Sequence, residues 1–494
     1  MSTFLSLNLI TDAWIPVRRK DGSRALIAPW QVADDSLAFP DWPRPDLNIA
    51  CLELLAGLVF LADPPRDSDD WRARQQPDPE RLRERLMPFA PAFELMGDGP
   101  RFMQDLEPME CEVKPSTPDM LFIDSAGGQT LRNNADIMVR RGRYLGLEPP
   151  IAAMALYTLQ AHAPAGGRGN RTSMRGGGPM VTLVDPGVGL WQLVWANVPD
   201  GKPASPEALP WMSPTRLSTN GEQVFPVDAD PAETFFSQPR RLRLIAENGR
   251  ITGVAQKPFG ANYAGWEHPL TPHYRVKAGS ELLPRHPRPG SFGYRNWLGV
   301  TARQKTTDDT ARRAKVIDLW GQRTQAFAEV IVAGWAMDNM KPRDFTFSRA
   351  PLINLPDELV ERMEAMVVAA ESIALALRGA IQPLFAEGEA REAFREAFFI
   401  QTQAPFESRL TSLKSSPWEE VAREWLADLR AAALELFEAE ALPGLAERDV
   451  KEQAEIVRAR RNLTAAFQGY GKEGREAFKA LGLPVPEQKK RKAA

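Results

Sequence analysis

The stretch Pro356-Asp-Glu-Leu-Val-Glu-Arg-Met-Glu-Ala-Met-Val-Val-Ala-Ala-Glu-Ser-Ile373 marks a change in the pattern of the chain. Apolar residues recur in it every three or four positions, the spacing that lines one face of a helix. They are Leu359, Met363, Met366, Val367, Ala370 and Ile373. Asp357 precedes them and can cap the first turn. The stretch therefore predicts an amphipathic helix that begins just after Pro356.

Similar patterns continue toward the C-terminus. They lie in Ala390–Ile400, in Trp418–Leu429 after Pro417, and from Val450 to Val457. Proline is favoured in the first turn of a helix because that turn needs no N–H donor. The helical stretches predict an antiparallel four-helix bundle over residues 356–486. Residues 487–494, with Lys489-Lys-Arg-Lys492, are expected to form a basic disordered tail.

Residues 1–355 have a different character, because proline and glycine interrupt short apolar runs. Leu52–Leu61 is apolar enough for a buried helix, and Asp21-Gly22 indicates a turn after a strand. Asn248-Gly249 between two strand-like runs predicts a hairpin. Met180–Val184 and Leu190–Val194, on either side of Asp185-Pro-Gly, also predict a hairpin. The fold class is therefore α+β: a large mixed N-terminal domain with irregular connections and a C-terminal bundle.

Composition restricts the possible function. The 494 residues are 25% charged and carry a formal net charge of −3, so a nucleic-acid surface requires local segregation of charge. Two cysteines and four histidines, without metal-ligand spacing, predict neither a disulfide scaffold nor a metal site. The N-terminus lacks a basic region before an apolar one, and no run of about 18 apolar residues occurs. The sequence therefore predicts a cytoplasmic protein without a membrane partner.

The segment Pro164-Ala-Gly-Gly-Arg-Gly-Asn-Arg-Thr-Ser-Met-Arg-Gly-Gly-Gly-Pro179 is dominated by glycine and arginine. Glycine lets a partner approach the main chain closely, and arginine supplies permanent charge and forked donors suited to phosphate. The segment therefore predicts contact with an anion, nucleic acid being the obvious candidate. The alternative is a flexible surface loop with incidental arginines. Packed elements are expected at both of its ends.

Other basic stretches extend this prediction. Between Val139 and Arg175 there are six arginines and a single acid, Glu148. The predicted phosphate contacts are Arg140, Arg141, Arg143, Arg171 and Arg175. The Arg140–Arg143 stretch could equally be a solvated face. Pro284–Trp297 interleaves basic and aromatic residues, which suits a nucleic-acid backbone and its bases; alternatively, its aromatic side chains pack on the core.

Catalytic motifs are missing from the sequence. The glycine segment contains neither a phosphate-binding P-loop nor a dinucleotide fingerprint. His162 is the only histidine beside it, and a lone histidine is more often structural. We therefore expect no catalytic residue and no cofactor. Two alternatives remain: an enzyme that binds a phosphorylated small molecule through Arg168 and His162, and a pure scaffold without DNA contacts.

Four stretches, taken in their order along the chain, match the pattern of a known family. They are Asn8-Leu-Ile-Thr-Asp-Ala-Trp-Ile-Pro-Val17, Phe102-Met-Gln104, Met174-Arg-Gly-Gly-Gly-Pro-Met-Val-Thr182 and Val332-Ala-Gly-Trp-Ala-Met-Asp-Asn339. In this order they resemble the large-subunit (CasA) family of the type I-E CRISPR surveillance complex, Cascade. The resemblance covers the whole chain, including the helical tail. Some relatives carry a cysteine cluster that this chain lacks, so no zinc is expected.

The resemblance implies an α+β domain followed by a four-helix bundle. It also implies a role in sensing the protospacer-adjacent motif in duplex DNA, opening the duplex for guide-RNA pairing, and docking a helicase–nuclease. In such complexes base pairing reads the target sequence and protein reads only the short flanking motif. The implied partners are double-stranded target DNA, the 5′ end of the guide RNA, other Cascade subunits and the helicase–nuclease.

The same resemblance assigns site residues. A glycine loop that reads the minor groove is implied for Ala165, Gly166, Gly167, Arg168 and Gly169, with Lys277 as a lysine finger. The degenerate minor groove suits such a reader, which tolerates several motifs. A wedge that splits the duplex is implied at Asp338, Asn339 and Met340, with either Asn339 or Met340 as its tip. A mobile loop that contacts RNA and the rest of the complex is implied from Phe122 to Asn133. Its named residues are Phe122, Ile123, Asp124, Gly127 and Gly128.

Overall fold

The structure is a computed structural model that describes residues 6–125, 127, 132–134, 136, 139–167, 169–304, 310–385 and 387–487. The chain folds into two compact units. Unit 1 contains the described residues of 1–289 and 308–352, and unit 2 those of 290–307 and 353–494. The predicted boundary after residue 355 lies close to the last crossing between the units. The prediction was wrong for residues 290–304, which it assigned to the N-terminal domain.

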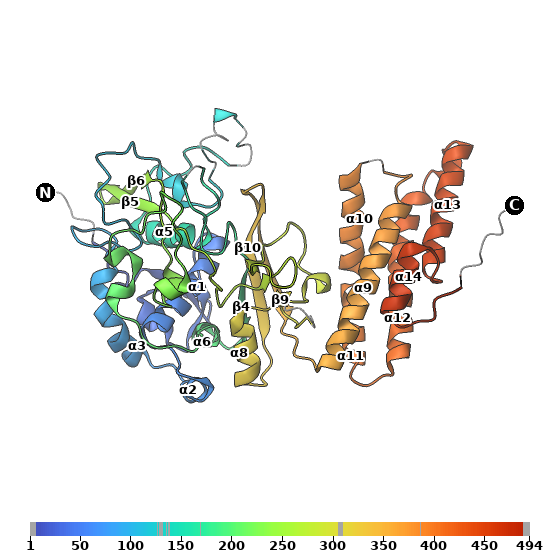
Figure 1. The fold of residues 1–494 in the computed structure, drawn as a ribbon, viewed down its shortest axis with the longest axis horizontal. Helices are drawn as coiled ribbons and strands as arrows, with labels where there is room; N and C mark the ends of the chain where they lie inside the picture. The colour runs from blue at the N-terminus through green and yellow to red at the C-terminus, as the bar shows by residue number, and fades with distance from the viewer. Residues whose placement is uncertain are drawn as a thin grey trace. The chain divides into compact units, whose positions relative to one another are not determined.

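Two apolar helices form the core of unit 1. Helices α1 (Pro45–Ala62) and α5 (Pro149–His162) both begin with proline, are buried along most of their length and contact each other (Figure 1). By length and composition α1 could cross a membrane, yet most of it is buried within the unit, as in the core helix of a soluble protein. The predicted buried helix over Leu52–Leu61 is confirmed. Both helices also bury polar side chains, including Glu53 and His162, which become important below.

The sheet that carries the long hairpin has the strand order β11-β10-β4 and is antiparallel. Its strands are β4 (Val181–Asp185), β10 (Glu329–Asp338) and β11 (Lys341–Pro351). In β10 both faces are covered, because Val330, Ile331, Val332 and Ala333 are all buried. Strand β10 pairs with β4 from Glu329 to Ala333 and with β11 along its whole length.

The predicted hairpin around Asp185-Pro-Gly is wrong. Residues Leu190–Ala196 form helix α6, and β4 pairs with the distant β10 instead. Helix α6 buries Leu190, Leu193 and Val194, whose spacing fits a helix as well as their composition fits a strand. Asn197 ends the helix and bonds both its Leu193 carbonyl and the main chain of β4 at Val184.

The described residues of unit 1 also form three smaller sheets. The first has the order β2-β1-β3, with β1 (Ile15–Arg19), β2 (Arg24–Ile27) and β3 (Leu37–Pro40). The second is the hairpin of β5 (Arg241–Glu247) and β6 (Arg250–Lys257). The third has the order β8-β7-β9, with β7 (His273–Tyr274), β8 (Leu283–Pro284) and β9 (Ala311–Arg312). The remaining α-helices in the described part of unit 1 are α2 (Ser68–Ala73), α3 (Pro79–Leu86), α7 (Glu233–Phe236) and α8 (Lys315–Arg323).

Two predicted turns are confirmed. Asn248 and Gly249 have φ values of 51° and 77°, the left-handed conformations that a two-residue hairpin turn requires. Gly22, at the turn between β1 and β2, has a φ of 86°. Both turns follow from residue types that reach positive φ at low cost.

Unit 2 is helical, as predicted. Its helices are α9 (Asp357–Ala380), α10 (Gly388–Gln401), α11 (Gln403–Ser412), α12 (Trp418–Ala441), α13 (Val450–Ala466) and α14 (Gly471–Ala480). Helix α9 contacts α10, α12, α13 and α14, and the helices lie side by side (Figure 1). Helices α11 and α14 were not predicted. The expected cap at Asp357 is corrected: Pro356 occupies the cap position and Asp357 lies in the first turn. The predicted tail lies almost wholly outside the described residues.

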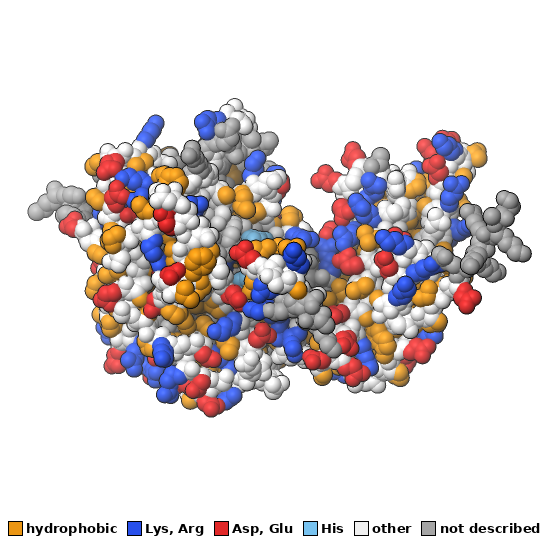
Figure 2. Space-filling model, viewed as in Figure 1, with side chains coloured by type: hydrophobic (Ala, Val, Ile, Leu, Met, Phe, Trp, Pro, Cys, Tyr) orange, Lys and Arg blue, Asp and Glu red, His pale blue; other side chains and the backbone are white. Residues whose placement is uncertain are grey.

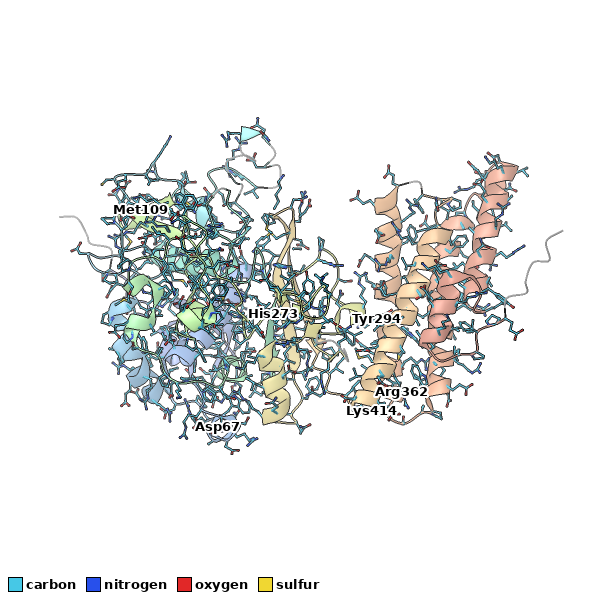
Figure 3. All side chains as sticks on the ribbon, viewed as in Figure 1. Asp67, Met109, His273, Tyr294, Arg362 and Lys414 are labelled. Carbon is cyan, nitrogen blue, oxygen red and sulfur yellow. The ribbon has the colours of Figure 1, made fainter. Side chains whose placement is uncertain are left out.

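The segment 290–304 supplies part of the core of unit 2. The Tyr294 ring stacks on Phe406 with 4.1 Å between centroids, and its hydroxyl lies 2.9 Å from the Thr402 Oγ1. Trp297 is buried and packs edge-on against Phe406. Tyr294 lies beside the helices of this unit in Figure 3. Tyr294 and Trp297 of the predicted basic–aromatic stretch therefore pack on a core, which was the alternative interpretation.

Candidate nucleic-acid interface

The first half of the glycine segment is an exposed loop that follows helix α5. Ala165, Gly166 and Gly167 are all exposed, and Gly167 has a φ of 91° with no atom within 4 Å of the position that a Cβ would take. Asn170 closes the loop: its main-chain N–H donates to the Gly167 carbonyl (3.1 Å) and its side chain to the Gly166 carbonyl (2.9 Å). The loop thus presents main chain to solvent. Arg168 lies outside the described residues.

Gly169 begins the return of the chain to the protein surface. It is half-buried and has a φ of 80°. A Cβ at this position would lie 2.7 Å from the Cβ of Pro258. Its carbonyl accepts a hydrogen bond of 2.7 Å from the Phe259 N–H. Glycine at 169 is therefore required by close packing as well as by backbone conformation.

The second half of the segment packs inward. A Cβ on Gly177 would lie 2.8 Å from Cα of Pro164 and 2.9 Å from Sδ of Met340. A Cβ on Gly178 would lie 2.6 Å from the Trp335 carbonyl oxygen, on strand β10. The two halves of one glycine-rich sequence thus serve different purposes, since one is exposed and the other lets the β10–β11 hairpin approach.

The tip of the β10–β11 hairpin is the predicted wedge. Asn339 and Met340 have φ values of 48° and 61°, so both occupy the left-handed region. The Asp338 side chain accepts a hydrogen bond from the Asn339 amide (2.9 Å) and pairs with Arg343 (2.6 Å). Met340 is 46% exposed, and its sulfur lies against Gly177. The structure therefore brings the hairpin tip and the glycine segment together.

Lys277 lies in the connection between β7 and β8. It is exposed, and Ser280 closes the turn by donating its N–H (3.1 Å) and its hydroxyl (2.7 Å) to the Lys277 carbonyl. No carboxylate of the described residues pairs with it. After β8, the Arg285 carbonyl accepts a hydrogen bond from the Met180 N–H at the end of the glycine segment (2.9 Å). The lysine hairpin is therefore tied to the same segment as the wedge.

Arg175, a predicted phosphate contact, is only 3% exposed. Its guanidinium forms an ion pair with Glu53 of α1 and also donates to the Ala161 carbonyl and the Thr271 hydroxyl. A side chain with these partners cannot reach a phosphate on the outside, so this prediction is wrong. Arg175 instead joins the glycine segment to the core.

The other predicted phosphate contacts differ in whether their side chains already have a protein partner. Arg140 is exposed. Arg141 pairs with Asp136 (2.5 Å), and Arg143 pairs with Asp124 (2.7 Å). Arg171 is half-buried and donates to the Ser218 hydroxyl and carbonyl, both at 2.8 Å. A phosphate would have to compete with a protein partner at Arg141, Arg143 and Arg171, whereas Arg140 is exposed.

Arg241 and Arg243 of β5 are both buried. Arg241 pairs with Asp105 (2.6 Å), and Arg243 pairs with Glu110 (2.9 Å). Their role is therefore to hold the 105–110 segment against β5. The sequence gives no local sign that their neighbour Arg240 differs from them, yet its surroundings are different, as described below.

A polar cluster lies beneath the glycine segment. Glu53, His162, Arg175 and His268 are all buried in it, and His162 Nε2 lies 3.6 Å from the Glu53 carboxylate. Burial raises the pKa of Glu53, but attraction to Arg175 and the histidines outweighs it and leaves the pKa below its usual range. Because His162 is buried, the alternative of an enzyme that binds a phosphorylated small molecule with the help of His162 has no support in the geometry.

The predicted RNA-contacting loop is described only in part. Phe122 and Ile123 are buried, and Phe122 stacks on Tyr144 with 4.4 Å between ring centroids. Asp124 pairs with Arg44 (3.1 Å) as well as with Arg143. Phe122 and Ile123 are buried and therefore not available to contact RNA, which corrects the prediction for these two residues. Gly127 is exposed, and Gly128 lies outside the described residues.

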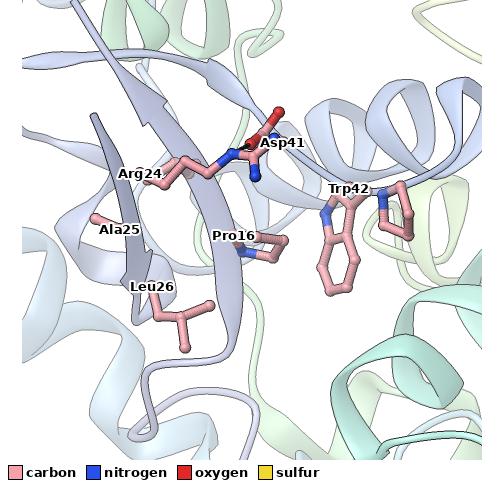
Figure 4. A pocket seen from close by; sticks show the side chains of 8 residues that line it. Pro16, Arg24, Ala25, Leu26, Asp41 and Trp42 are labelled. Carbon is pink, nitrogen blue, oxygen red and sulfur yellow. Dashed lines mark ion pairs between the residues drawn. The ribbon is translucent and has the colours of Figure 1, made fainter. Parts of the chain in front are cut away.

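A pocket of about 480 Å³ lies apart from these residues, at the β2-β1-β3 sheet (Figure 4). It is lined by Pro16, Val17, Arg24, Ala25, Leu26, Asp41, Trp42 and Pro43. Its charged residues, Arg24 and Asp41, pair with each other at 2.6 Å. The rest of its lining is apolar, so the pocket offers a ligand mainly hydrophobic contact.

The visible face of unit 1 carries basic and acidic side chains interspersed (Figure 2). Within the described ranges, no group of three or more His, Cys, Asp or Glu side chains could hold a metal ion. Cys51 is buried and Cys111 is exposed, and both are free thiols. On this face, contact with an anion would therefore come from local features rather than from a broad basic field.

A family model described as CRISPR-associated protein Cse1 matches residues 8–436. The chain belongs to the Cse1 family. Among solved structures, CasA of Thermus thermophilus matches with a TM-score of 0.71 and 18% identity, over 94% of this chain and 100% of that one. Cse1 of Thermobifida fusca matches with a TM-score of 0.70 and 19% identity, over 97% and 98%. A chain of a structure titled "CRISPR RNA-guided surveillance complex" matches with a TM-score of 0.66 and 16% identity, over 93% of this chain and 99% of that one.

These matches confirm the resemblance to the large subunit of type I-E Cascade. They also confirm the fold class, a mixed α+β part with a helical C-terminal part. At such low identity the structural matches establish the fold alone, so individual site residues depend on the geometry of this chain.

Proposed function

We propose that this Cse1-family chain is the non-catalytic Cascade subunit that recognises a short flanking motif in double-stranded DNA and opens the duplex beside it. The glycine loop at 165–169 reads the minor groove with Lys277, and the hairpin tip at Asn339–Met340 enters the base stack. Guide RNA, other Cascade subunits and a helicase–nuclease are its further partners in this proposal.

One observation carries the proposal: the exposed glycine loop and the hairpin tip share a junction. Pro164 and Met340 both lie against Gly177, so the main chain that would read the motif and the side chain that would part the next base step are fixed together. A minor-groove reader needs little side-chain volume, because the groove is narrow. An apolar side chain such as Met340 is the kind that unstacks base pairs when it inserts.

Of the two candidates for the tip, Met340 has the stronger support. The Asn339 side chain is held by Asp338, whereas Met340 is apolar and half-exposed beside the loop. Asn339 would have to give up its intramolecular hydrogen bond before contacting a base.

The test uses the assembled complex and electrophoretic binding to duplexes with and without the motif. Lys277→Ala and Gly167→Pro are expected to lower motif-dependent affinity and R-loop formation, because the first removes an exposed cation and the second forbids a φ of 91°. Lys202→Ala is the control, since Lys202 is an exposed lysine on a loop that packs on α1. Unchanged motif-dependent binding in both variants would contradict the proposal.

A further inference from the structure

Arg240 directly precedes strand β5 and is fixed to the last turn of α5. Its N–H donates to the Gln160 side chain, and its carbonyl accepts from the same side chain, both at 3.0 Å. Its guanidinium turns toward the glycine loop, where Nη2 donates to the Pro164 carbonyl. A Cβ on Gly166 would overlap with Nη1 of Arg240. The guanidinium therefore lies directly beneath the exposed main chain of Gly166.

This arginine lacks the counter-charge that its neighbours have. Arg241 and Arg243 are paired with Asp105 and Glu110, whereas Arg240 forms no ion pair in the part of the chain that the structure describes. It is 6% exposed, and its Nε is buried without a hydrogen-bond partner. Burial lowers the pKa of Arg240 to about 10, so the side chain is still charged at neutral pH.

A buried charge without a partner is costly, and proteins seldom keep one unless something else completes the site. Both terminal nitrogens of Arg240 lie against the glycine loop, Nη2 at the Pro164 carbonyl and Nη1 at Gly166. Gly166, which lies against the guanidinium, and the exposed Gly167 that follows it have no side chain that would keep a ligand away from the loop. The missing partner is therefore expected to be an anion that approaches the glycine loop from solvent.

We propose that Arg240 is the cationic support of the glycine loop and that it pairs with a backbone phosphate of the DNA duplex bound there. This inference rests on the proposed function, since it places the duplex on the same loop. It adds a residue to the site and explains why position 166 is glycine: any Cβ would displace the guanidinium. The Pro164 hydrogen bond makes Arg240 a positioning residue as well, because it holds the root of the loop.

The test measures the affinity of the assembled complex for a motif-bearing duplex as a function of salt. Each neutralised phosphate contributes about 0.9 to the slope of log affinity against log salt. Arg240→Gln is expected to weaken binding roughly tenfold, the effect of losing a charge-assisted hydrogen bond, and to reduce the slope by about 0.9. Arg240→Lys keeps the charge and is expected to retain the slope. A purely structural role would leave the slope of Arg240→Gln unchanged, which would overturn the inference.

Arg323→Gln is the matched control for the loss of a buried arginine. Arg323 is 3% exposed, pairs with Asp200 and donates to the Val198 carbonyl, none of which belongs to the glycine segment. Its replacement is expected to leave the salt slope unchanged. An equal change of slope in both variants would also overturn the inference.

Gly166→Ala keeps the test decisive if Arg240→Gln does not fold. It retains the charge but pushes the guanidinium away from the loop, and a roughly tenfold loss of affinity is expected. Combining it with Arg240→Gln should add little further loss if both changes act on one contact. Wild-type affinity in Gly166→Ala would overturn the inference.

The outcomes separate this inference from the proposed function. If Lys277→Ala and Gly167→Pro abolish motif-dependent binding while Arg240→Gln changes neither affinity nor slope, only the inference fails. If the wild-type complex does not distinguish the motif, the proposed function fails, and the role of Arg240 fails with it.

Discussion

Glu53 of helix α1 and Arg175 of the glycine segment form an ion pair that is almost fully buried. The two side chains are 1% and 3% exposed, and Nη1 of Arg175 lies 3.1 Å from Oε2 of Glu53. The pair joins residues 122 positions apart in the chain. It therefore fixes the end of an exposed loop to the centre of unit 1.

Breaking this pair is expected to destabilise unit 1. Glu53→Gln leaves the Arg175 cation buried without its counter-ion, which should lower the free energy of unfolding by about 3–5 kcal/mol. Urea unfolding of the purified protein measures the effect. Arg423→Gln is the control, because the exposed Arg423–Glu419 pair on α12 should contribute less than about 0.5 kcal/mol. Equal effects of the two substitutions would show that the buried pair is not a structural anchor.

The same cluster predicts a loss of stability in acid. Burial, reinforced by the Arg175 cation, lowers the pKa of His268 well below its usual 6.5, and the pKa of Glu53 lies below its usual 4.5. In both cases the unfolded chain binds more protons than the folded one. The contribution of His268 is therefore lost as pH falls below 6.5, and that of Glu53 as it falls below 4.5.

Urea unfolding at about pH 7.5, 5.5 and 4.0 checks this dependence. The free energy of unfolding of the wild type should fall with pH, with its steepest decline in the lowest interval. Glu53→Gln should show a shallower decline in that interval, because it has no carboxylate to protonate. A steeper decline in the variant would contradict the assignment.

The junction of loop and hairpin predicts a sharp effect at Gly177. In Gly177→Ala the new methyl group would meet the main chain of Pro164 at 2.8 Å, which cannot move as a flexible side chain could. We expect motif-dependent affinity of the assembled complex to fall by roughly tenfold or more, since small displacements of a recognition site are costly. Gly99→Ala is the control, because nothing lies within 4 Å of its added Cβ.

The backbone conformation of Met340 is unfavourable for folding, whereas its side chain is the proposed wedge. Its φ of 61° is unfavourable for a non-glycine residue by roughly 1–2 kcal/mol. Met340→Gly should therefore stabilise the turn, or at least not weaken it, while removing the proposed wedge. The expected result is an unchanged or higher unfolding midpoint together with slower R-loop formation. If R-loop formation proceeds at the wild-type rate, Met340 is not the wedge.

The packing of Tyr294 predicts that the stability of unit 2 depends on residues that precede its helices by more than fifty positions in the sequence. Tyr294→Ala removes a buried ring that stacks on Phe406, and large-to-small changes of this kind cost about 3–5 kcal/mol. A fragment that begins at Ile353 lacks Tyr294 and Trp297 altogether and should unfold at a lower urea concentration than unit 2 in the full chain. Circular dichroism at the helical wavelength follows both experiments. Equal midpoints for the fragment and the full chain would contradict this account of unit 2.

Local patterns predicted those parts of the fold that local chemistry determines. Leu52–Leu61 had to be buried because of its composition, and Asn248-Gly249 had to turn because both residues reach positive φ readily. The helical spacing after Pro356 was likewise sufficient. In each case the signal lies within one element.

The sequence failed where a distant residue decides the environment. Leu190–Val194 suits a strand or a helix by composition, and β4 found its partner in β10 rather than nearby. Arg175 has the same local sequence character as an exposed arginine, and only Glu53 explains its burial. Arg240 and Arg241 are adjacent, yet one is unpaired within the described residues and the other is paired with Asp105.

The candidate site was predicted only in those parts that lie within a single segment of the chain. The exposed loop at 165–167, the Lys277 turn and the Asn339–Met340 turn were all named from the sequence. The junction at Gly177 and the position of Arg240 could not be, because each depends on contacts between segments far apart in the chain.

The route of the backbone has a consequence for how such proteins can be taken apart. The chain leaves unit 1 after residue 289, belongs to it again by residue 310 and leaves it once more after residue 352. Unit 2 therefore cannot be exchanged between proteins as one continuous segment. A single recombination point after residue 352 would transfer the helices without Tyr294 and Trp297, which belong to the same unit. Cleavage by a protease at any one of the three connections would likewise yield two pieces that still share a folded unit, rather than two separable modules.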